Sequence, residues 1–290
     1  MKDIYAEVTN RIIEELEKGI IPWEKPWAGI STGAISHSTG RPYSLLNQML
    51  LGKPGEYITF NQCKQEGGHV KKGAKARMVV FWKVLPREKK DSAGNAVKDA
   101  DGNAVIEGLP VLRYFQVFHL DDCEGIAPKW GEDRPVATAD PDERAEAVLM
   151  DYIQREGIKL VQNISDEAYY SPLADVIHLP LMEQFAQTAE YYSTAFHEAT
   201  HSTGHSKRLN RLNTSLSARF GSEIYSKEEL VAEIGAATIL NELGMETQSS
   251  IRNSAAYVQS WLRALKNDKR MIVSAAARAE KAVKMILGVE

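Results

Sequence analysis

The stretch YYSTAFHEATHSTGH, residues 191 to 205, carries the residues best suited to chemistry in this 290-residue chain. It places His197 and His201 four residues apart, with Glu198 directly after the first histidine. On an α-helix this spacing sets two imidazoles one turn apart on one face, where their nitrogens can bind a single tetrahedral ion. The glutamate can then act on the water that the ion polarises. This is the H-E-x-x-H arrangement of metal-dependent hydrolysis; the alternative is a solvated helix face that carries two histidines.

Two histidines leave such an ion short of protein ligands, so a third ligand must come from elsewhere in the chain. His205 is a poor choice, because a continuing helix carries it about 12 Å from His197 at roughly 1.5 Å per residue. A histidine six residues after His201 would be another solution, but Lys207 occupies that position. We therefore expect the third ligand on a separate element and interpret His205 as a polar residue beyond the helix end.

The downstream segment SKEELVAEIGAATILNELG supplies carboxylates at helical spacing. Glu229 and Glu233 stand four residues apart, which places them on one helix face beside apolar residues. We expect Glu229 as the third ligand and Glu233 as the acidic residue that supports a ligand histidine from behind. On the sequence alone these two roles are exchangeable, and Glu228 is interpreted as a charge near the helix N-terminus. The alternative for the pair is an acidic row on a helix surface.

Apolar spacing predicts the elements that position these residues. In the second half, helical periodicity occurs over residues 141–157, 188–204, 226–243, 252–266 and 269–286. Between the first two helices, the short segments IKLVQN, AYYS and DVIHL are rich in β-branched and aromatic residues and predict strands. The fold class is therefore α+β. Turn-forming residues near 125–140 predict a linker, with one domain over 1–135 and a second over 136–290.

Composition points to a globular chain that remains inside the cell. The sequence is 43% hydrophobic and 26% charged, and it has no apolar run long enough to cross a membrane. The first 19 residues are amphipathic and acidic, unlike a secretory signal. Cys63 and Cys123 form no CxxC pair and fit a reducing compartment. We expect a cytoplasmic location and no membrane partner, and the sequence gives no basis for an oligomeric state.

A basic cluster in the first half predicts an anion-binding surface. Residues 64 to 90 hold nine lysines and arginines against two glutamates, and aromatic residues are interspersed with them. Cations together with aromatic faces are what binding of single-stranded DNA requires. The residues expected to contact DNA are Lys71, Lys72, Lys75, Arg77, Trp23, Trp27, Trp82 and Arg41. The alternatives are tryptophans that fill a core and lysines on an ordinary solvated surface.

The stretch DSAGNAVKDADGNAVIEG, residues 91 to 108, begins like a calcium-binding loop but departs from that pattern. Gly102 stands at a wrong position, and the bidentate glutamate at the end of such a loop is missing. The Gly-Asn and Asp-Gly pairs are instead typical of turns between strands. We expect an exposed hairpin that joins strands near residues 78–85 and 111–120.

Several longer stretches carry a resemblance to a known family. In the second half they are YYSPLADVIHLP, YYSTAFHEATHSTGH, RLNR and EELVAEIGAA, and in the first half IPWEKPW, YSLLNQMLL, TFNQCKQEGGHVKKGAKARMVVFWK and YFQVFHLDD. With them the chain resembles the ArdC-type antirestriction proteins of conjugative plasmids. The resemblance covers residues 1 to 286, and residues 91 to 108 match no family motif.

The resemblance implies an N-terminal mixed α/β domain that binds single-stranded DNA and a C-terminal zincin-like metallopeptidase domain, with DVIHLP as the edge strand along the substrate cleft. His197, His201 and Glu229 would bind the ion, and Glu198 would be the general base that later protonates the leaving amine. Zn²⁺ follows from the ligand types, although Mn²⁺ or Co²⁺ suits the same groups. The residue that assists the oxyanion stays unassigned among Tyr169, Tyr170 and His205.

Three functions are compatible with these observations. In the first, the protein coats incoming single-stranded plasmid DNA and protects it from host restriction. In the second, the C-terminal domain is an active peptidase that cleaves a host defence protein or a DNA-associated protein. In the third, the chain accompanies replication proteins or a primase, but the sequence contains no primase motif.

Overall fold

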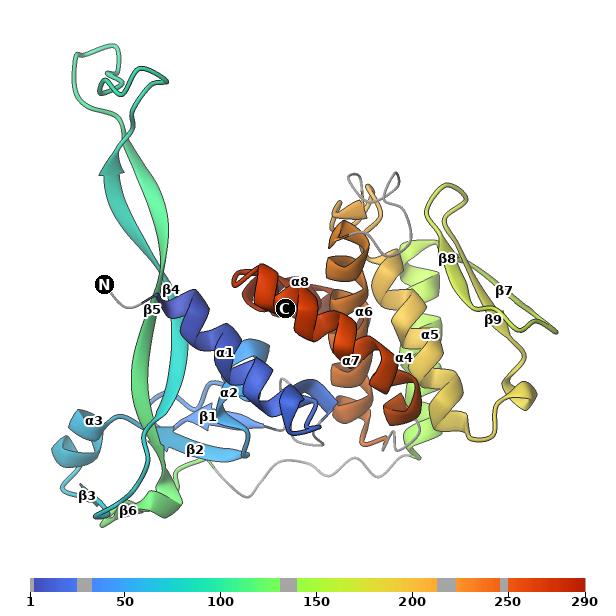
Figure 1. Ribbon diagram of the computed structural model, residues 1–290, viewed down its shortest axis with the longest axis horizontal. Helices are drawn as coiled ribbons and strands as arrows, with labels where there is room; N and C mark the ends of the chain where they lie inside the picture. Colours follow the sequence, from blue (N-terminus) through green and yellow to red (C-terminus); the bar gives the residue numbers. More distant parts are fainter. Residues whose placement is uncertain (1–2, 25–32, 131–139, 213–222, 246–249, 290) are drawn as a thin grey trace.

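The computed structural model describes residues 3–24, 33–130, 140–212, 223–245 and 250–289 (Figure 1). It has the predicted α+β class. None of the helices in these ranges is both long and apolar enough to cross a membrane. The predicted linker and its boundary at 135/136 lie largely within 131–139, outside the described residues.

The first half is organised around a four-stranded sheet with the order β1-β2-β5-β4. Its strands are β1 (Ala34–Ser36), β2 (Gly55–Ile58), β4 (Arg77–Glu88) and β5 (Ile106–His119). A second, two-stranded sheet pairs β3 (His69–Val70) with β6 (Cys123–Glu124). The helical segments of this half are α1 (Ile4–Glu17), η1 (Pro22–Glu24), α2 (Leu45–Leu51), α3 (Phe60–Gln65) and η2 (Leu120–Asp122).

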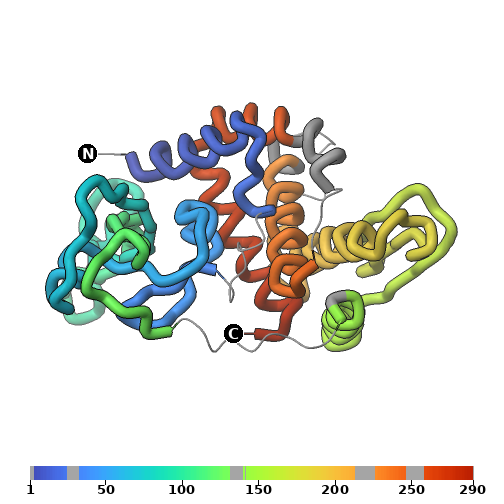
Figure 2. Tube along the Cα trace, turned by 90° about the horizontal axis from the view of Figure 1, so that it is seen from below, coloured from blue at the N-terminus to red at the C-terminus, as the bar shows by residue number. Residues whose placement is uncertain are grey.

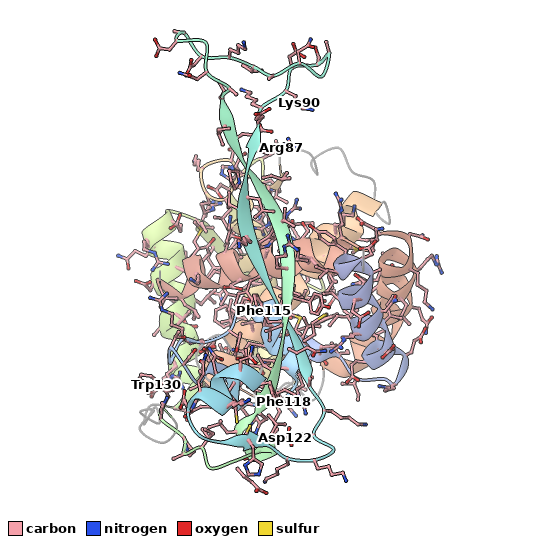
Figure 3. All side chains as sticks on the ribbon, turned by 90° about the vertical axis from the view of Figure 1, so that its left-hand side faces the viewer. Arg87, Lys90, Phe115, Phe118, Asp122 and Trp130 are labelled. Atoms are coloured by element: carbon pink, nitrogen blue, oxygen red, sulfur yellow. The ribbon has the colours of Figure 1, made fainter. Side chains whose placement is uncertain are left out.

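The strands β4 and β5 form a long antiparallel hairpin that extends well beyond the rest of the first half (Figures 1 and 3). The residues between them form two turns of the same kind. Asp91 Oδ1 accepts hydrogen bonds from the backbone N–H groups of Ala93 and Asn95, and Asp99 Oδ1 accepts the equivalent bonds from Asp101 and Asn103 in the next turn. Gly94 has a φ of 87°, a backbone conformation that favours glycine. The predicted hairpin is therefore confirmed.

The second half contains the predicted helices and strands in the predicted order. Its helical segments are α4 (Pro141–Glu156), η3 (Met182–Gln184), α5 (Thr188–Ser202), α6 (Glu223–Leu243), α7 (Ser250–Asn267) and α8 (Met271–Leu287). Its strands are β7 (Lys159–Asn163), β8 (Tyr169–Ser171) and β9 (Val176–Pro180), in the order β7-β9-β8. The expectation that DVIHLP forms the edge strand is wrong, because β9 pairs with β7 on one side and β8 on the other. The antiparallel edge is β8.

The two halves share a hydrophobic core. Helix α1 packs against α7 and α8, and Figure 2 shows it alongside these C-terminal helices. Val8 and Ile12 of α1 belong to the same buried cluster as Leu230 and Ile234 of α6. Trp23 lies in this cluster as well, with its ring centroid 5.4 Å from that of Trp261. Helix α6 is thus held from both sides, by the first half and by α5.

Candidate metal centre and nucleic-acid surface

Helix α5 carries the histidine motif, and α6 packs closely beside it. The close approach depends on a glycine, because a Cβ atom at Gly235 would lie 2.7 Å from Cγ2 of Thr200 on α5. Such a distance is far inside van der Waals contact. With only a hydrogen at this position, α6 can bring Glu229 over the two histidines of α5.

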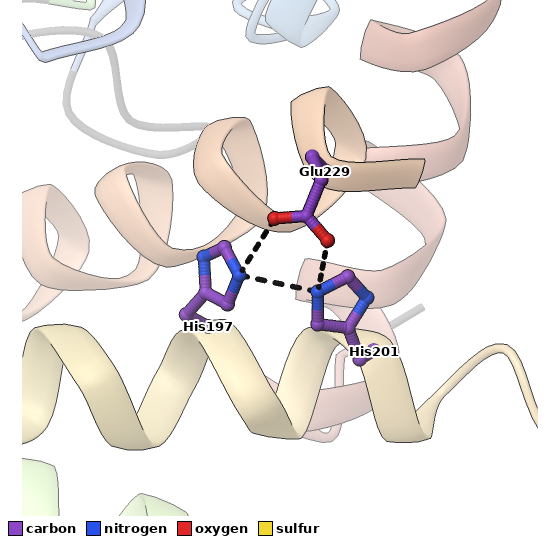
Figure 4. A group of neighbouring side chains, drawn as sticks. All are labelled: His197, His201 and Glu229. Atoms are coloured by element: carbon purple, nitrogen blue, oxygen red, sulfur yellow. Dashed lines mark hydrogen bonds and ion pairs between the residues drawn. The ribbon is translucent and has the colours of Figure 1, made fainter. Parts of the chain in front are cut away.

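The three predicted ligands lie together between the two helices (Figure 4). The Nε2 atoms of His197 and His201 are 3.1 Å apart. Glu229 places Oε2 3.6 Å from Nε2 of His197 and Oε1 3.3 Å from Nε2 of His201. All three side chains are only partly exposed, with 19%, 14% and 12% of their surfaces accessible.

These distances fit a divalent metal ion. Tetrahedral ligand atoms about 2.0–2.1 Å from an ion are separated from each other by roughly 3.3 Å. The two ring nitrogens are 3.1 Å apart, and each oxygen of Glu229 lies 3.3 Å or 3.6 Å from one of them, close to this value. With one ligand atom taken from each residue, all three atoms lie within 4.8 Å of one another. Two imidazole nitrogens and a carboxylate also form a ligand set typical of metal sites that keep one position open for water or substrate.

Charged neighbours determine the protonation of the cluster. Burial lowers the pKa of His201, but hydrogen bonds with Glu228 and Glu229 raise it to about 10. Burial also works to lower the pKa of His197, but the hydrogen bond with Glu229 outweighs it, so the pKa is raised. Burial works to raise the pKa of Glu229, yet its contacts with both histidines hold the value well below its usual range. The cluster therefore favours positive charge between the rings, which a divalent cation supplies in place of protons.

Glu228 supports His201 from the side of the ring that faces away from Glu229. Its Oε1 lies 3.4 Å from Nδ1 of His201, and the side chain is only 8% exposed. Arg211 holds the carboxylate, since its Nε lies 3.0 Å and 3.1 Å from the two oxygens. The interpretation of Glu228 as a helix-end charge is therefore wrong. Glu233 lies behind the other histidine, with Oε1 3.7 Å from Nδ1 of His197, and burial raises its pKa.

The segment RLNR after α5 supplies two buried arginines, Arg208 and Arg211, that were not among the expected site residues. Arg211 donates to Oγ1 of Thr203 at 2.5 Å and also to the carbonyl of Thr200. Arg208 donates to the carbonyl of Ser202 at 2.8 Å and pairs with Asp175. Cations that satisfy the last carbonyls of a helix stabilise its C-terminus. Two arginines three residues apart, directly after a helix end, were the signal in the sequence for this capping of α5.

Glu198 and the oxyanion candidates come from α5, from β8 and from the segment after α5. Glu198 is buried on α5 beside His197, with 8% of its surface exposed. Tyr170 donates a hydrogen bond to Asp175 at 2.7 Å, so its hydroxyl is engaged in the fold. Tyr169 on the edge strand is 45% exposed, and its ring stacks on His178. His205 is engaged as well, because its Nδ1 accepts a hydrogen bond from the backbone N–H of Lys207 at 3.2 Å.

The residues expected to contact DNA do not form one patch. Lys71, Lys72 and Lys75 are exposed at the base of the hairpin, where Lys71 Nζ donates to the carbonyl of Asp121 at 2.8 Å. Trp82 is 52% exposed and lies five residue pairs further along β4 than Arg77, about 17 Å at 3.3–3.4 Å per residue.

Two of the other residues that were expected to contact DNA, Trp23 and Arg77, are buried or only partly exposed. Trp23 has no exposed surface, so its expected role in base stacking is wrong; its ring instead fills the shared core. Arg77 donates to the carbonyl of Leu51 and is only partly exposed. Arg41 is exposed, and Trp27 lies outside the described residues.

The hairpin exposes aromatic rings beyond those that were expected to contact DNA. On the face opposite Trp82, Phe81 is 44% exposed and Phe115 is 54% exposed, with ring centroids 5.9 Å apart. Figure 3 shows Phe115 midway along the hairpin. Pairing of Phe81 with Arg113 puts a cation beside the rings. The signal in the sequence was that aromatic residues stand next to basic ones, with Phe81 and Trp82 before Lys83 and with Tyr114 and Phe115 after Arg113.

Fold and site together define a zincin-like metallopeptidase domain, and residues 144–278 match the family model of that description. Residues 2–118 match the model of the N-terminal domain of anti-restriction factor ArdC. The antirestriction ArdC protein from plasmid R388 is 34% identical, and the comparison covers 98% of this chain and 97% of that one. Its metal-free and Mn(II)-bound structures superpose with TM-scores of 0.74 and 0.75. The chain belongs to the ArdC antirestriction family.

Curated relatives include longer proteins. Two proteins called DNA primase TraC, both from Escherichia coli, are 35% identical over the whole chain, which spans only 27% and 20% of their lengths. The uncharacterized protein y4eC of Sinorhizobium fredii is 30% identical over 96% of this chain and 90% of its own length. Because the chain corresponds to a small part of the TraC proteins, their name does not favour a priming function here.

Proposed function

We propose that this protein binds single-stranded DNA through its first half and protects incoming plasmid DNA from restriction. The observation that carries the proposal is the hairpin, which combines exposed aromatic rings with lysines at its base. Unpaired bases stack on such rings while cations contact the phosphates. The similarity to the ArdC protein of R388 supports the antirestriction part.

The salt dependence of binding tests the DNA surface. Changing Lys71 and Lys72 to Ala removes two exposed cations, so affinity for a labelled oligonucleotide should fall. The slope of log affinity against log salt should lessen by about 0.7 for each lost phosphate contact. The control is Lys159→Ala with Lys207→Ala, two exposed lysines of the second half. An unchanged slope in the first variant excludes the lysine cluster as a DNA contact.

Protection itself is measured by transferring a plasmid into a restricting host with and without the protein. Masking of the strand predicts that Glu198→Gln protects as well as the unchanged protein does, because this substitution leaves the DNA surface intact. Loss of protection in Glu198→Gln, with DNA binding retained, would instead assign the activity to hydrolysis.

We further propose that His197, His201 and Glu229 hold the metal ion, with Zn²⁺ as the first choice and Mn²⁺ or Co²⁺ as ions that suit the same ligands. His201→Ala should abolish stoichiometric metal in elemental analysis of the purified protein. His205→Ala is the matched control, since this histidine lies beyond the end of α5 and its ring contacts Lys207 and Asp175 instead of the proposed ligands. Full metal content in His201→Ala refutes the ligand assignment.

A second candidate function is peptide-bond hydrolysis, which the convergence of the three ligand atoms beside Glu198 favours. A bound divalent ion acts as a Lewis acid that polarises a carbonyl and lowers the pKa of water. Glu198 would take a proton from the attacking water and deliver it to the leaving amine. Arg211 and Glu228 would keep the His201 ring in place. Release of fragments from a protein substrate by the unchanged protein, but not by Glu198→Gln, tests this function.

A further inference from the structure

A cleft between the two halves of the chain lies apart from both the metal centre and the lysine cluster. It has a volume of about 330 Å³, and it is formed by α1, β4 and α8. This volume is at the lower end of the ~300–1,000 Å³ typical of small-ligand sites. The residues that line it are Tyr5, Trp82, Arg270, Val273, Ser274, Ala277, Arg278 and Lys281. The lining contains three cations and no acidic residue.

Helix α8 contributes the floor and the rim of the cleft. Ser274, Ala277, Arg278 and Lys281 follow the i, i+3, i+4, i+7 spacing of one helix face, and all four are exposed. The small side chains of Ser274 and Ala277 leave room, while the two cations project beside them. Within the described ranges, no carboxylate lies at ion-pair distance from Arg278 or Lys281. Their charges are available to an anionic ligand.

The opposite wall is aromatic. Trp82 is 52% exposed, and its ring centroid lies 6.4 Å from that of Tyr5, with an angle of 60° between the planes. A base inserted between two rings needs parallel planes about 7 Å apart, twice the contact distance of stacked carbons. The tilt therefore excludes insertion, and the open face of Trp82 is the place for a base. Arg270 covers the Tyr5 ring at 5.1 Å.

We propose that this cleft is a nucleotide-binding subsite shared by both halves, in which a base of an unpaired strand stacks on Trp82 and the adjoining phosphates contact Arg270, Arg278 and Lys281. The inference rests on the proposed binding of single-stranded DNA and adds a contact from the second half. Charge complementarity favours a nucleic-acid strand, and the exposed tryptophan favours one with unpaired bases. An acidic peptide would use the cations without needing the open indole face.

The charge of the second half, net acidic as a whole, gave no reason to expect a DNA contact there. The three cations of the cleft are placed opposite Trp82 only because α8 packs beside α1 and the hairpin in the folded chain. An isolated first half would lack the phosphate-contacting side of this subsite.

The first experiment measures binding of the full-length protein to a labelled fifteen-nucleotide oligothymidylate over a series of salt concentrations. Arg278→Gln with Lys281→Gln should weaken binding and lessen the salt slope by about 1.4, the value for two lost phosphate contacts. Lys159→Gln with Lys207→Gln removes the same charge from the far side of the second half and should leave the slope unchanged. Equal behaviour of the two double variants overturns the proposal.

The second experiment separates stacking from charge. Trp82→Ala should weaken binding of the oligothymidylate about 5-fold to 150-fold, the range for loss of a base–aromatic stack, and Trp82→Phe should restore most of it. On an abasic strand of equal length, Trp82→Ala should bind like the unchanged protein, while the double variant of Arg278 and Lys281 should still bind more weakly. An equal loss on both strands in Trp82→Ala contradicts base stacking.

Two outcomes distinguish this subsite from the wider proposal. Failure of the unchanged protein to bind the oligothymidylate at low salt refutes the proposed DNA-binding function altogether. Binding that depends on Lys71 and Lys72, but not on the cleft residues, refutes the subsite alone. Polyglutamate of similar charge should compete poorly; displacement of the oligonucleotide at equal charge concentration would make the cleft an acidic-peptide site and overturn the assignment to DNA.

Discussion

Glu228 approaches His201 from the side away from His197 and Glu229, with 3.4 Å between Oε1 and Nδ1 of the ring. The same carboxylate is held by Arg211, whose side chain is 6% exposed. His201 is thus fixed at one nitrogen while its other nitrogen faces His197 and Glu229. A histidine oriented in this way loses less freedom when it binds a metal ion.

We predict that Glu228→Gln lowers affinity for Zn²⁺ or Mn²⁺ by about 10- to 100-fold, the range observed when a residue behind a ligand histidine is changed. Competition with a chelator of known affinity measures the effect. Glu233→Gln is the comparison, because its carboxylate is 3.7 Å from His197 and makes no hydrogen bond to the ring. A larger loss in Glu233→Gln would reverse the roles assigned to the two glutamates.

Local spacing was sufficient to predict the helices, the strands and the paired histidines of the candidate metal centre. His197 and His201 are close because of helix geometry. Glu229 was expected as the third ligand but was exchangeable with Glu233 on the sequence alone, and only the packing of α6 on α5 shows which of the two approaches both rings. The role of Glu228 was not predictable, since it depends on Arg211, whose position is set by a turn. The strand order was also missed, because the position of β9 between β7 and β8 is a long-range property.

The tryptophans also show that long-range packing cannot be predicted from local sequence. Trp23 and Trp82 both stand near lysines in the sequence, yet one fills the core and the other is half exposed. We predict that Trp23→Ala lowers the free energy of unfolding by about 3–5 kcal/mol, as expected for a large buried ring. Trp82→Ala should change it by much less. Urea unfolding measures both values.

Trp23→Phe is the control for this prediction. Its indole N–H is buried and has no hydrogen-bond partner among the described residues, so a phenyl ring loses little besides volume. If Trp23→Ala unfolds at the same urea concentration as the unchanged protein, the ring does not support the core shared by the two halves.

The packing of α5 on α6 makes Gly235 a sensitive position. Gly→Ala in a helix interior ordinarily stabilises by about 1 kcal/mol. Here the added Cβ would lie 2.7 Å from Cγ2 of Thr200, so Gly235→Ala should push the helices apart and weaken metal binding. Thr200→Ala combined with Gly235→Ala removes the obstructing atoms and should recover much of the affinity. Normal metal binding by Gly235→Ala alone would show that the helices have room to spare.

An ion pair near the end of α5 should govern acid stability. Burial works to raise the pKa of Asp175, but hydrogen bonds from Arg208 and Tyr170 outweigh it and lower the value below the usual 3.8. A carboxyl whose pKa is lowered by folding contributes stability that is present above about pH 4. That stability is lost as the pH falls through the lower pKa of the folded state. Arg208 is only 1% exposed and depends on this partner.

Asp175→Asn keeps the shape of the side chain and suits the positive φ of 54° at this position, but it leaves the arginine without a counter-charge. We predict a loss of about 3–5 kcal/mol near pH 7, the usual cost of breaking a buried pair on one side. The difference between the two proteins should shrink below pH 4, because protonation removes the same charge from the unchanged protein. Urea unfolding between pH 3 and pH 7 measures this convergence, and a difference that stays constant over the range would mean that Asp175 does not titrate with a lowered pKa.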